Sequence, residues 1–144
     1  MPLDFDCSLE ITIGASPAAV QRAVLEDIGQ WMVSPQNNEL MSLRIEPHVG
    51  GRVFRDLGEG QGHLWAHISV LKPGLIEMVG PFANIEPSYS LIRFRFHESG
   101  TNETKLEFTH QATGSISNEM GQNAEMGWRQ VLEKGLKEHV ERSN

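Results

Sequence analysis

The chain has 144 residues, of which 39% are hydrophobic and 22% are charged, and this size and composition fit one globular domain spanning residues 1–144. Its 12 Lys and Arg residues against 19 Asp and Glu residues give a formal net charge of −7, which makes nucleic acid and anionic membranes poor partners. The single cysteine, Cys7, excludes an intrachain disulfide. No apolar run approaches the ~20 residues that span a bilayer, and the first residues lack the pattern of a secretory signal. We therefore expect a cytoplasmic protein without membrane insertion.

The N-terminal segment predicts one strand followed by two short helices. Residues 7–13 alternate apolar and polar side chains, as a half-buried strand does. Ser16 and Pro17 then mark a helix start, because serine caps free N–H groups and proline suits the first helical position. This helix is expected to end near Glu26. A second helical piece is expected over residues 28–32, with Trp31 as its apolar anchor.

A series of strands is predicted for the middle of the chain, separated by turns rich in glycine and proline. The expected strands are residues 40–46, 52–57, 63–71, 75–79, 89–97 and 105–113. Their short connections imply an antiparallel sheet. Alternation places Phe94, Phe108 and His110 on inner faces, but it does not determine which face of 52–57 and 63–71 points inward.

A long helix is predicted over residues 117–141, with Ser117 as its cap. Its apolar side chains recur at helical spacing and form one stripe: Met120, Ala124, Trp128, Val131, Leu132, Gly135, Leu136 and Val140. No other element is long enough to cover the sheet. The sequence thus predicts an α+β fold in which a curved antiparallel sheet of about six or seven strands wraps round this helix, with a cavity between them.

The order and spacing of several short motifs resemble the START-like superfamily, also called SRPBCC or helix-grip, which includes the birch pollen allergen and the polyketide cyclases. Within it, the chain resembles the branch named after the C-terminal domain of the heat-shock-protein-90 ATPase activator. The residues that carry this resemblance are Ile11 to Ile13, Ala15 to Pro17, Val20, Trp31, Val49 to Arg52, Gly62, Leu71 to Pro73, Thr104 to His110, Gly127, Trp128, Leu132 and Leu136. The resemblance implies a fold and a cavity; it does not name a reaction, because the superfamily contains carriers, cyclases, hydrolases and chaperone partners.

The leading functional hypothesis is the binding of a hydrophobic or amphipathic small molecule between the sheet and the C-terminal helix. A cavity lined by aromatic and flexible apolar side chains suits such a ligand. The expected walls are Trp31, Phe54, Phe94, Phe108, Met120, Ala124 and Trp128, and His110 is the expected polar contact. No cofactor is expected.

No metal site is expected either. His63 and His67 are four residues apart, so a regular strand would place them on one face but ~13 Å apart, too far to share one ion.

Two other function classes stay open. His110 could serve as the acid or base of a cyclase-like or hydrolase-like enzyme. The resemblance also implies a chaperone-associated interaction module, and Trp65, if it faces outward, would mark an interface, including one in a homodimer. An inward Arg52 or Arg55 would indicate an anionic group on the ligand, since an unpaired buried cation is costly.

Overall fold

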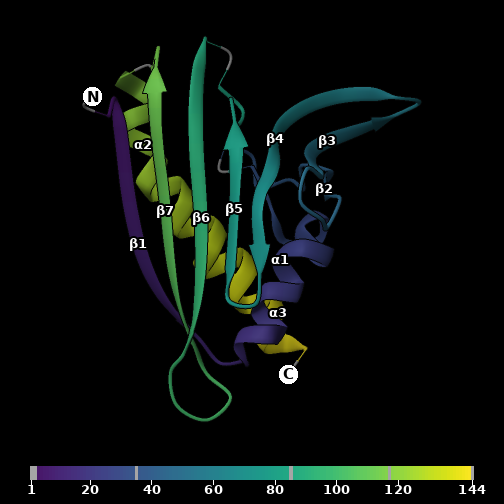
Figure 1. Cartoon of the computed structure of the whole chain (residues 1–144), viewed down its shortest axis with the longest axis vertical. Helices are drawn as coiled ribbons and strands as arrows, with labels where there is room; N and C mark the ends of the chain where they lie inside the picture. Colours follow the sequence, from purple (N-terminus) through teal and green to yellow (C-terminus); the bar gives the residue numbers. More distant parts are fainter. Residues whose placement is uncertain (1–2, 35, 85, 117, 144) are drawn as a thin grey trace.

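The computed structural model describes residues 3–34, 36–84, 86–116 and 118–143, with the side chains of all of these except 118–120 and 122. Figure 1 shows the strands as one sheet with the helices behind it. The elements are β1 (Phe5–Ile13), α1 (Pro17–Trp31), β2 (Leu43–Ile45), β3 (Arg52–Gly58), β4 (Gln61–Lys72), β5 (Leu75–Gly80), β6 (Ser88–Glu98), β7 (Thr104–Gly114), α2 (Asn118–Gln130), the π-helical η1 (Val131–Lys137) and α3 (Glu138–Arg142).

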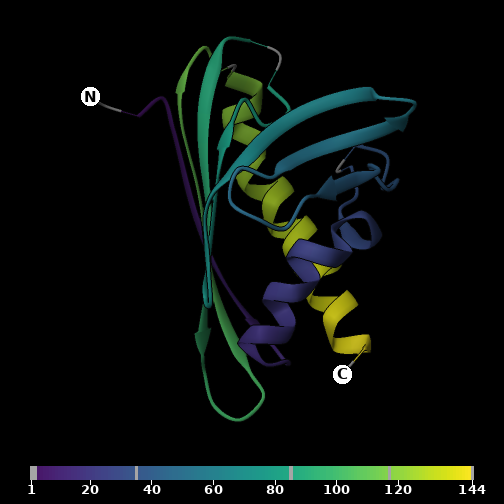
Figure 2. The ribbon, with the colours of Figure 1, turned by 45° about the vertical axis from the view of Figure 1, so that its right-hand side comes forward.

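The seven strands form one antiparallel sheet in the order β1-β7-β6-β5-β4-β3-β2. The helical segment α2–η1–α3 runs along one side of this sheet (Figure 2). This arrangement confirms the predicted α+β architecture. The predicted strand over residues 40–46 is shorter than expected, because only Leu43–Ile45 pairs with β3 and Leu40 forms an isolated bridge with Val33.

The two predicted N-terminal helices are a single helix, α1. The apolar positions Val20 and Val24 continue at helical spacing through Ile28 to Trp31, and all four are buried on one face. The helix therefore has no reason to break near Glu26. Its start is as predicted: the Ser16 hydroxyl accepts a hydrogen bond from the Ala19 N–H at 3.2 Å.

The buried face of the C-terminal helix includes Val131, Leu132, Leu136 and Val140, as the apolar stripe predicts. Gly135 lies where η1 crosses α1, and a Cβ at this position would come within 2.5 Å of the Trp31 carbonyl oxygen. Only glycine permits this close approach of the two helices. The predicted cap Ser117 lies outside the described residues. No described helix is both long enough and apolar enough to cross a membrane.

Irregular pairing along β4 bends one end of the sheet. The register with β3 steps from Val53–Ala66 to Phe54–Leu64, so that Trp65 is an additional residue on β4. A second irregularity lies between Ile68 and Val70. Such bulges bend a strand and increase its twist. We call β2, β3 and residues 61–67 of β4 the arm; Figure 2 shows it bending out of the sheet towards the side that carries the helices.

Candidate functional site

An aromatic cluster lies between the sheet and α2. Phe94 on β6 and Phe108 on β7 are almost completely buried, and their ring centroids lie 5.2 Å apart. Trp128 of α2 packs on Phe108 with a centroid distance of 4.5 Å. Trp128 itself is half-buried, and so is Ala124, which lies one helical turn earlier on the same face of α2. The structure therefore brings together four of the predicted wall residues.

His110 lies at the polar edge of this cluster and uses both of its ring nitrogens. The Trp128 Nε1–H donates to His110 Nδ1 at 3.0 Å. His110 Nε2 lies 2.9 Å from the hydroxyl oxygen of Ser90, which is also buried. An indole nitrogen can only donate a hydrogen bond, so Nδ1 must be unprotonated and Nε2 must carry the proton. Burial lowers the pKa of His110 from the ordinary 6.5 to about 4, which keeps the ring neutral at pH 7.

This tautomer determines what the Ser90–His110 pair can do chemically. A histidine that activates a serine accepts the hydroxyl proton on its unprotonated nitrogen. Here the protonated nitrogen faces Ser90 and the unprotonated one faces Trp128. His110 therefore orients Trp128 and Ser90 but does not activate the serine as a nucleophile.

Phe82, in the loop between β5 and β6, joins the cluster and was not predicted. Its ring lies 4.9 Å from Trp65 and 5.5 Å from Trp128. Its backbone is left-handed, with φ of 45°, which is costly for a bulky residue. A hydrogen bond from the Phe82 N–H to the Trp65 carbonyl oxygen and the ring contacts hold it there. The only sequence signal was a lone aromatic residue in an irregular segment.

The face of Trp65 was left open by the sequence, and the structure shows that it points inward, which removes the alternative in which an outward Trp65 marks an interface. The bulge on β4 allows Trp65 and its neighbour Ala66 both to be buried, at 7% and 1% exposure. Gly80 makes room for this part of β4, because a Cβ there would lie 2.4 Å from the Trp65 carbonyl oxygen. Trp65 thus connects the base of the arm to the aromatic cluster through Phe82.

Two predicted wall residues, Trp31 and Phe54, lie away from this cluster. Trp31 is buried where α1 meets η1, and its Nε1–H donates to the Ala23 carbonyl oxygen at 3.0 Å. Phe54 belongs to the outer face of the arm. The Met120 side chain lies outside the described residues.

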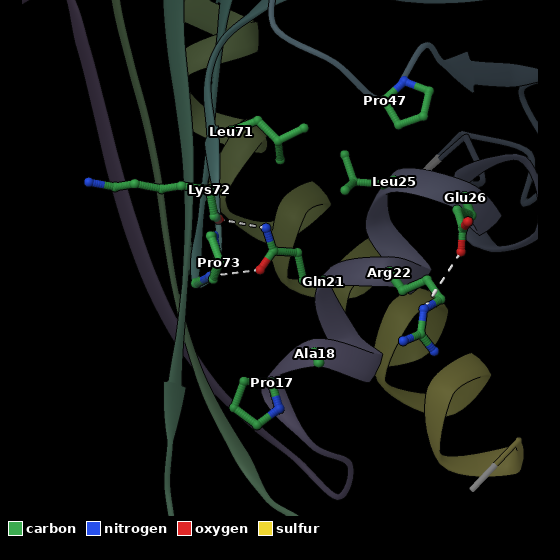
Figure 3. A pocket seen from close by; sticks show the side chains of 11 residues that line it. Pro17, Ala18, Gln21, Arg22, Leu25, Glu26, Pro47, Leu71, Lys72 and Pro73 are labelled. Atoms are coloured by element: carbon green, nitrogen blue, oxygen red, sulfur yellow. Dashed lines mark hydrogen bonds and ion pairs between the residues drawn. The ribbon is translucent and has the colours of Figure 1, made fainter.

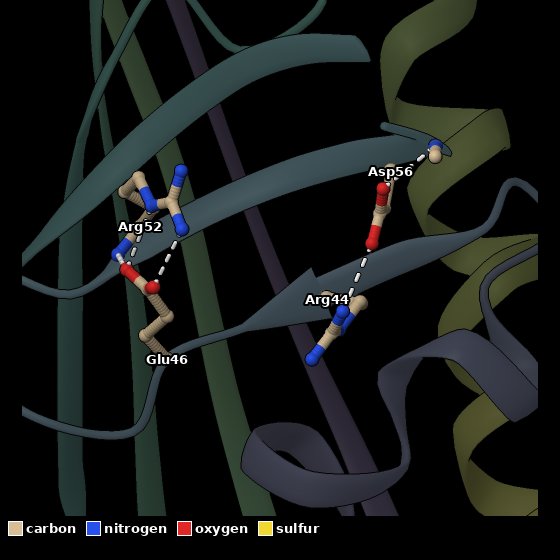
Figure 4. Close-up of polar contacts among 5 residues, drawn as sticks. Arg44, Glu46, Arg52 and Asp56 are labelled. Atoms are coloured by element: carbon tan, nitrogen blue, oxygen red, sulfur yellow. Dashed lines mark hydrogen bonds and ion pairs between the residues drawn. The ribbon is translucent and has the colours of Figure 1, made fainter. Parts of the chain in front are cut away.

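The outer face of the arm carries a ladder of ion pairs (Figure 4). Arg52 and Glu46 are 2.7 Å apart, and Arg44 and Asp56 are 2.9 Å apart. The guanidinium groups of Arg52 and Arg44 lie 4.5 and 5.9 Å from the centroid of the Phe54 ring, which places this ring among them and corrects its assignment to the cavity wall. Hydrogen bonds from Arg52 lower the pKa of Glu46 to about 2.

The register resolves which arm residues face inward. Arg55 is directly opposite the buried Leu43 on β2 and opposite His63 on β4. Directly paired residues share a face, so Arg55 and His63 are on the inner face while Arg52 is outside. The bulge at Trp65 also reverses the alternation, so His67 is on the outer face. The expectation that His63 and His67 share one face is therefore wrong.

A second candidate site is a surface groove of about 620 Å³ between α1 and the β4–β5 turn (Figure 3). Its apolar lining includes Pro17, Ala18, Leu25, Pro47, Leu71 and Pro73. Gln21 is the polar residue at its centre, but its amide already donates to the Lys72 carbonyl oxygen and accepts from the Gly74 N–H. Figure 3 shows the Lys72 side chain directed away from the groove. Arg22 and Glu26, which pair at 3.9 Å, add an exposed charged pair to the lining. The groove therefore combines apolar contact with one charged pair.

Comparison with known proteins reports only on the fold. No family model and no curated protein matches the sequence. Among solved structures, the chain is similar to protein MLL2253 from Mesorhizobium loti (20% identity, 96% of this chain and 98% of that chain, TM-score 0.73). It is also similar to protein CV1439 from Chromobacterium violaceum (20% identity, 94% of this chain and 96% of that chain, TM-score 0.72). DynU16, from the dynemicin biosynthetic locus, is 14% identical over 98% of this chain and 49% of its own, with a TM-score of 0.67. Identities this low show a shared fold and no more.

Proposed function

We propose that the protein binds a small, largely apolar molecule beside Trp128 and Ala124, on the side of the sheet towards which the arm bends. The observation that supports this most is that Trp128, a large aromatic residue, is only half-buried. Its position is fixed by Phe108, Phe82 and His110, yet part of its surface is not covered by the described side chains. An immobilised aromatic surface binds apolar molecules well, because no side-chain freedom is lost on binding.

The polar chemistry of the cluster supports binding over catalysis. His110 is neutral and already hydrogen-bonded through both nitrogens. Its tautomer leaves Ser90 without a base. A ligand would therefore gain its binding free energy mainly from buried apolar area, about 25 cal/mol for each Å² removed from water.

The proposal includes the family of the protein and its location in the cell. The strand order and the helix against the sheet support membership of the START-like superfamily. A cytoplasmic location remains an expectation from the sequence.

Blocking each candidate site in turn tests the proposal. We expect neutral apolar probes such as 1-decanol and 2-naphthol to raise the melting temperature of the unmodified protein. Ala124→Phe places a bulky ring beside Trp128, and we expect it to abolish this shift. Ala18→Phe is the matched control, because Ala18 is exposed and lines the α1 groove.

The control also separates the two sites. If Ala18→Phe removes the shift and Ala124→Phe preserves it, the groove is the binding site and the proposal is wrong. An absence of any shift in the unmodified protein, confirmed by titration calorimetry, also overturns it.

A further inference from the structure

Arg55 has a side chain on the inner face of the sheet with no counter-charge. It lies opposite the buried Leu43, and its Nε is buried without a hydrogen-bond partner. Within the described part of the chain, no carboxylate lies within ion-pair distance of its guanidinium. Arg93 provides the contrast: it is also half-buried, but it lies 3.1 Å from Glu77 on the outer face.

Arg55 is half-buried, and its buried Nε costs stability. A buried donor without a partner loses its hydrogen bonds to water and gains none in return, and the loss is larger for a charged group. Among the described side chains, the other buried polar atom without a partner is the hydroxyl oxygen of Thr109. That group is neutral, and Thr109 alternates with the inward Phe108 and His110 and so faces the opposite side of the sheet. Arg55 is therefore the unusual case.

The place of Arg55 along the arm connects it to the proposed binding site. Arg55 pairs with His63, which precedes Trp65 by two residues on β4. The Trp65 ring contacts Phe82, and Phe82 contacts Trp128. A molecule lying against the aromatic cluster would thus have its apolar part next to rings and its far end towards Arg55 and the His63 ring nitrogens.

We infer that Arg55 binds the carboxylate of an amphipathic ligand whose apolar part lies against Trp128; this inference rests on the proposed function. The guanidinium matches a carboxylate with two parallel hydrogen bonds. One unpaired cation balances one negative charge, and the net charge of −7 disfavours a multiply charged group such as a phosphate monoester. The partner of Arg55 is thus supplied by the ligand.

Decanoate and 1-decanol distinguish the contribution of the carboxylate from that of the apolar chain. In titration calorimetry at pH 7, we expect the unmodified protein to bind decanoate at least about tenfold more tightly than 1-decanol, as for a hydrogen bond to a charged group. Arg55→Gln should remove this preference and leave 1-decanol binding unchanged. Arg55→Lys should retain part of it, because the charge remains but the paired donors are lost. Arg44→Gln, on the outer face of the same arm, is the matched control and should change neither affinity.

Three results would overturn the inference. The first is equal affinity for the two probes in the unmodified protein, which leaves the proposed function intact. The second is an equal loss of both affinities in Arg55→Gln and Arg55→Lys, which indicates a structural role. The third is binding of neither probe, which overturns the proposed function as well. Melting without ligand gives an independent readout: Arg55→Gln should melt at the same temperature as the unmodified protein or higher, whereas a structural arginine would lower it.

Discussion

His110 and Arg55 both lie on the inner face of the same sheet, but they differ in how their nitrogen atoms are satisfied. Both ring nitrogens of His110 have hydrogen-bond partners, whereas the buried Nε of Arg55 has none among the residues that the structure describes. His110 belongs to the half formed by β1, β5, β6 and β7, where the cross-strand register between β6 and β7 is unbroken. Arg55 belongs to the arm, where β4 contains bulges. The histidine with a partner for each ring nitrogen thus lies in the regular half, and the arginine whose buried Nε has none among the described residues lies in the arm.

The origin of this difference lies in the pairing of the strands. A regular antiparallel ladder places residues in fixed cross-strand pairs, so Ser90, His110 and the rings around them meet side by side. A bulge changes the direction of the strand and of the side chains that follow it. The bulge at Trp65 directs this ring into the core and bends the arm, and Arg55 lies on the inner face of this arm. Substitutions in the regular half and in the arm should therefore have different consequences.

The largest effect is expected in the regular half, for Phe108→Ala. Phe108 has no exposed surface and contacts both Phe94 and Trp128. Deleting such a ring leaves a cavity that costs about 3–5 kcal/mol of unfolding free energy. Urea denaturation followed by circular dichroism would measure it, with Phe108→Leu as a milder variant if the alanine protein does not fold. A loss under 1 kcal/mol would mean that the cluster is not tightly packed.

The pH dependence of stability gives the second expected effect, in the same half. Because burial lowers the pKa of His110 from 6.5 to about 4, the unfolded chain binds a proton more readily than the folded protein does. The stabilisation is complete above pH 6.5 and is lost as the pH falls from 6.5 towards 4, by about 3 kcal/mol in total.

The measurement is a series of urea denaturation curves between pH 7 and pH 4, with His110→Gln as the control. The variant should lack the loss in this window, whatever its stability at pH 7. The contribution of Glu46, whose pKa is lowered to about 2, declines below about pH 4.5 in both proteins and therefore cancels when their curves are compared. Parallel pH curves for the two proteins would show that His110 is not held neutral by the fold.

The regular half was also the part that sequence reasoning predicted well. Strict alternation over 105–113 placed Phe108 and His110 inward, and both are buried. Helical spacing likewise predicted the buried face at Val131 to Val140. Such periodicity predicts which residues of one helix or strand share a face, and the prediction is reliable where that helix or strand is regular.

Cross-strand contacts and bulges could not be predicted in the same way. The Ser90–His110 contact depends on the register between β6 and β7, and the sequence of one strand alone does not determine that register. The bulge at Trp65 follows from pairing with β3, and without it the faces of Phe54 and Arg55 could not be assigned. Trp31 was placed at the cavity because α1 was expected to end early. Phe82 lies in an irregular segment without hydrophobic periodicity, so no pattern predicted its inward position.

The smallest effect is expected on the outer face of the arm, for Phe54→Ala. This ring is half-buried among Arg44 and Arg52. Its removal therefore leaves no enclosed cavity, because the surrounding surface is already in contact with solvent. We expect a loss of about 1 kcal/mol or less of unfolding free energy, from reduced apolar contact alone, and unchanged binding of decanoate and 1-decanol.

Phe54→Ala is also the most direct check on the register of the arm. Phe54 and Arg55 are neighbours on β3, so they must face opposite sides of a regularly paired strand. A loss of 3 kcal/mol or more, together with weaker binding of 1-decanol, would mean that Phe54 points inward. Arg55 would then be on the outer face, where water supplies its hydrogen bonds, and it would have no need of a ligand carboxylate. An effect confined to about 1 kcal/mol keeps Arg55 on the inner face, where the carboxylate of the proposed ligand would be its partner.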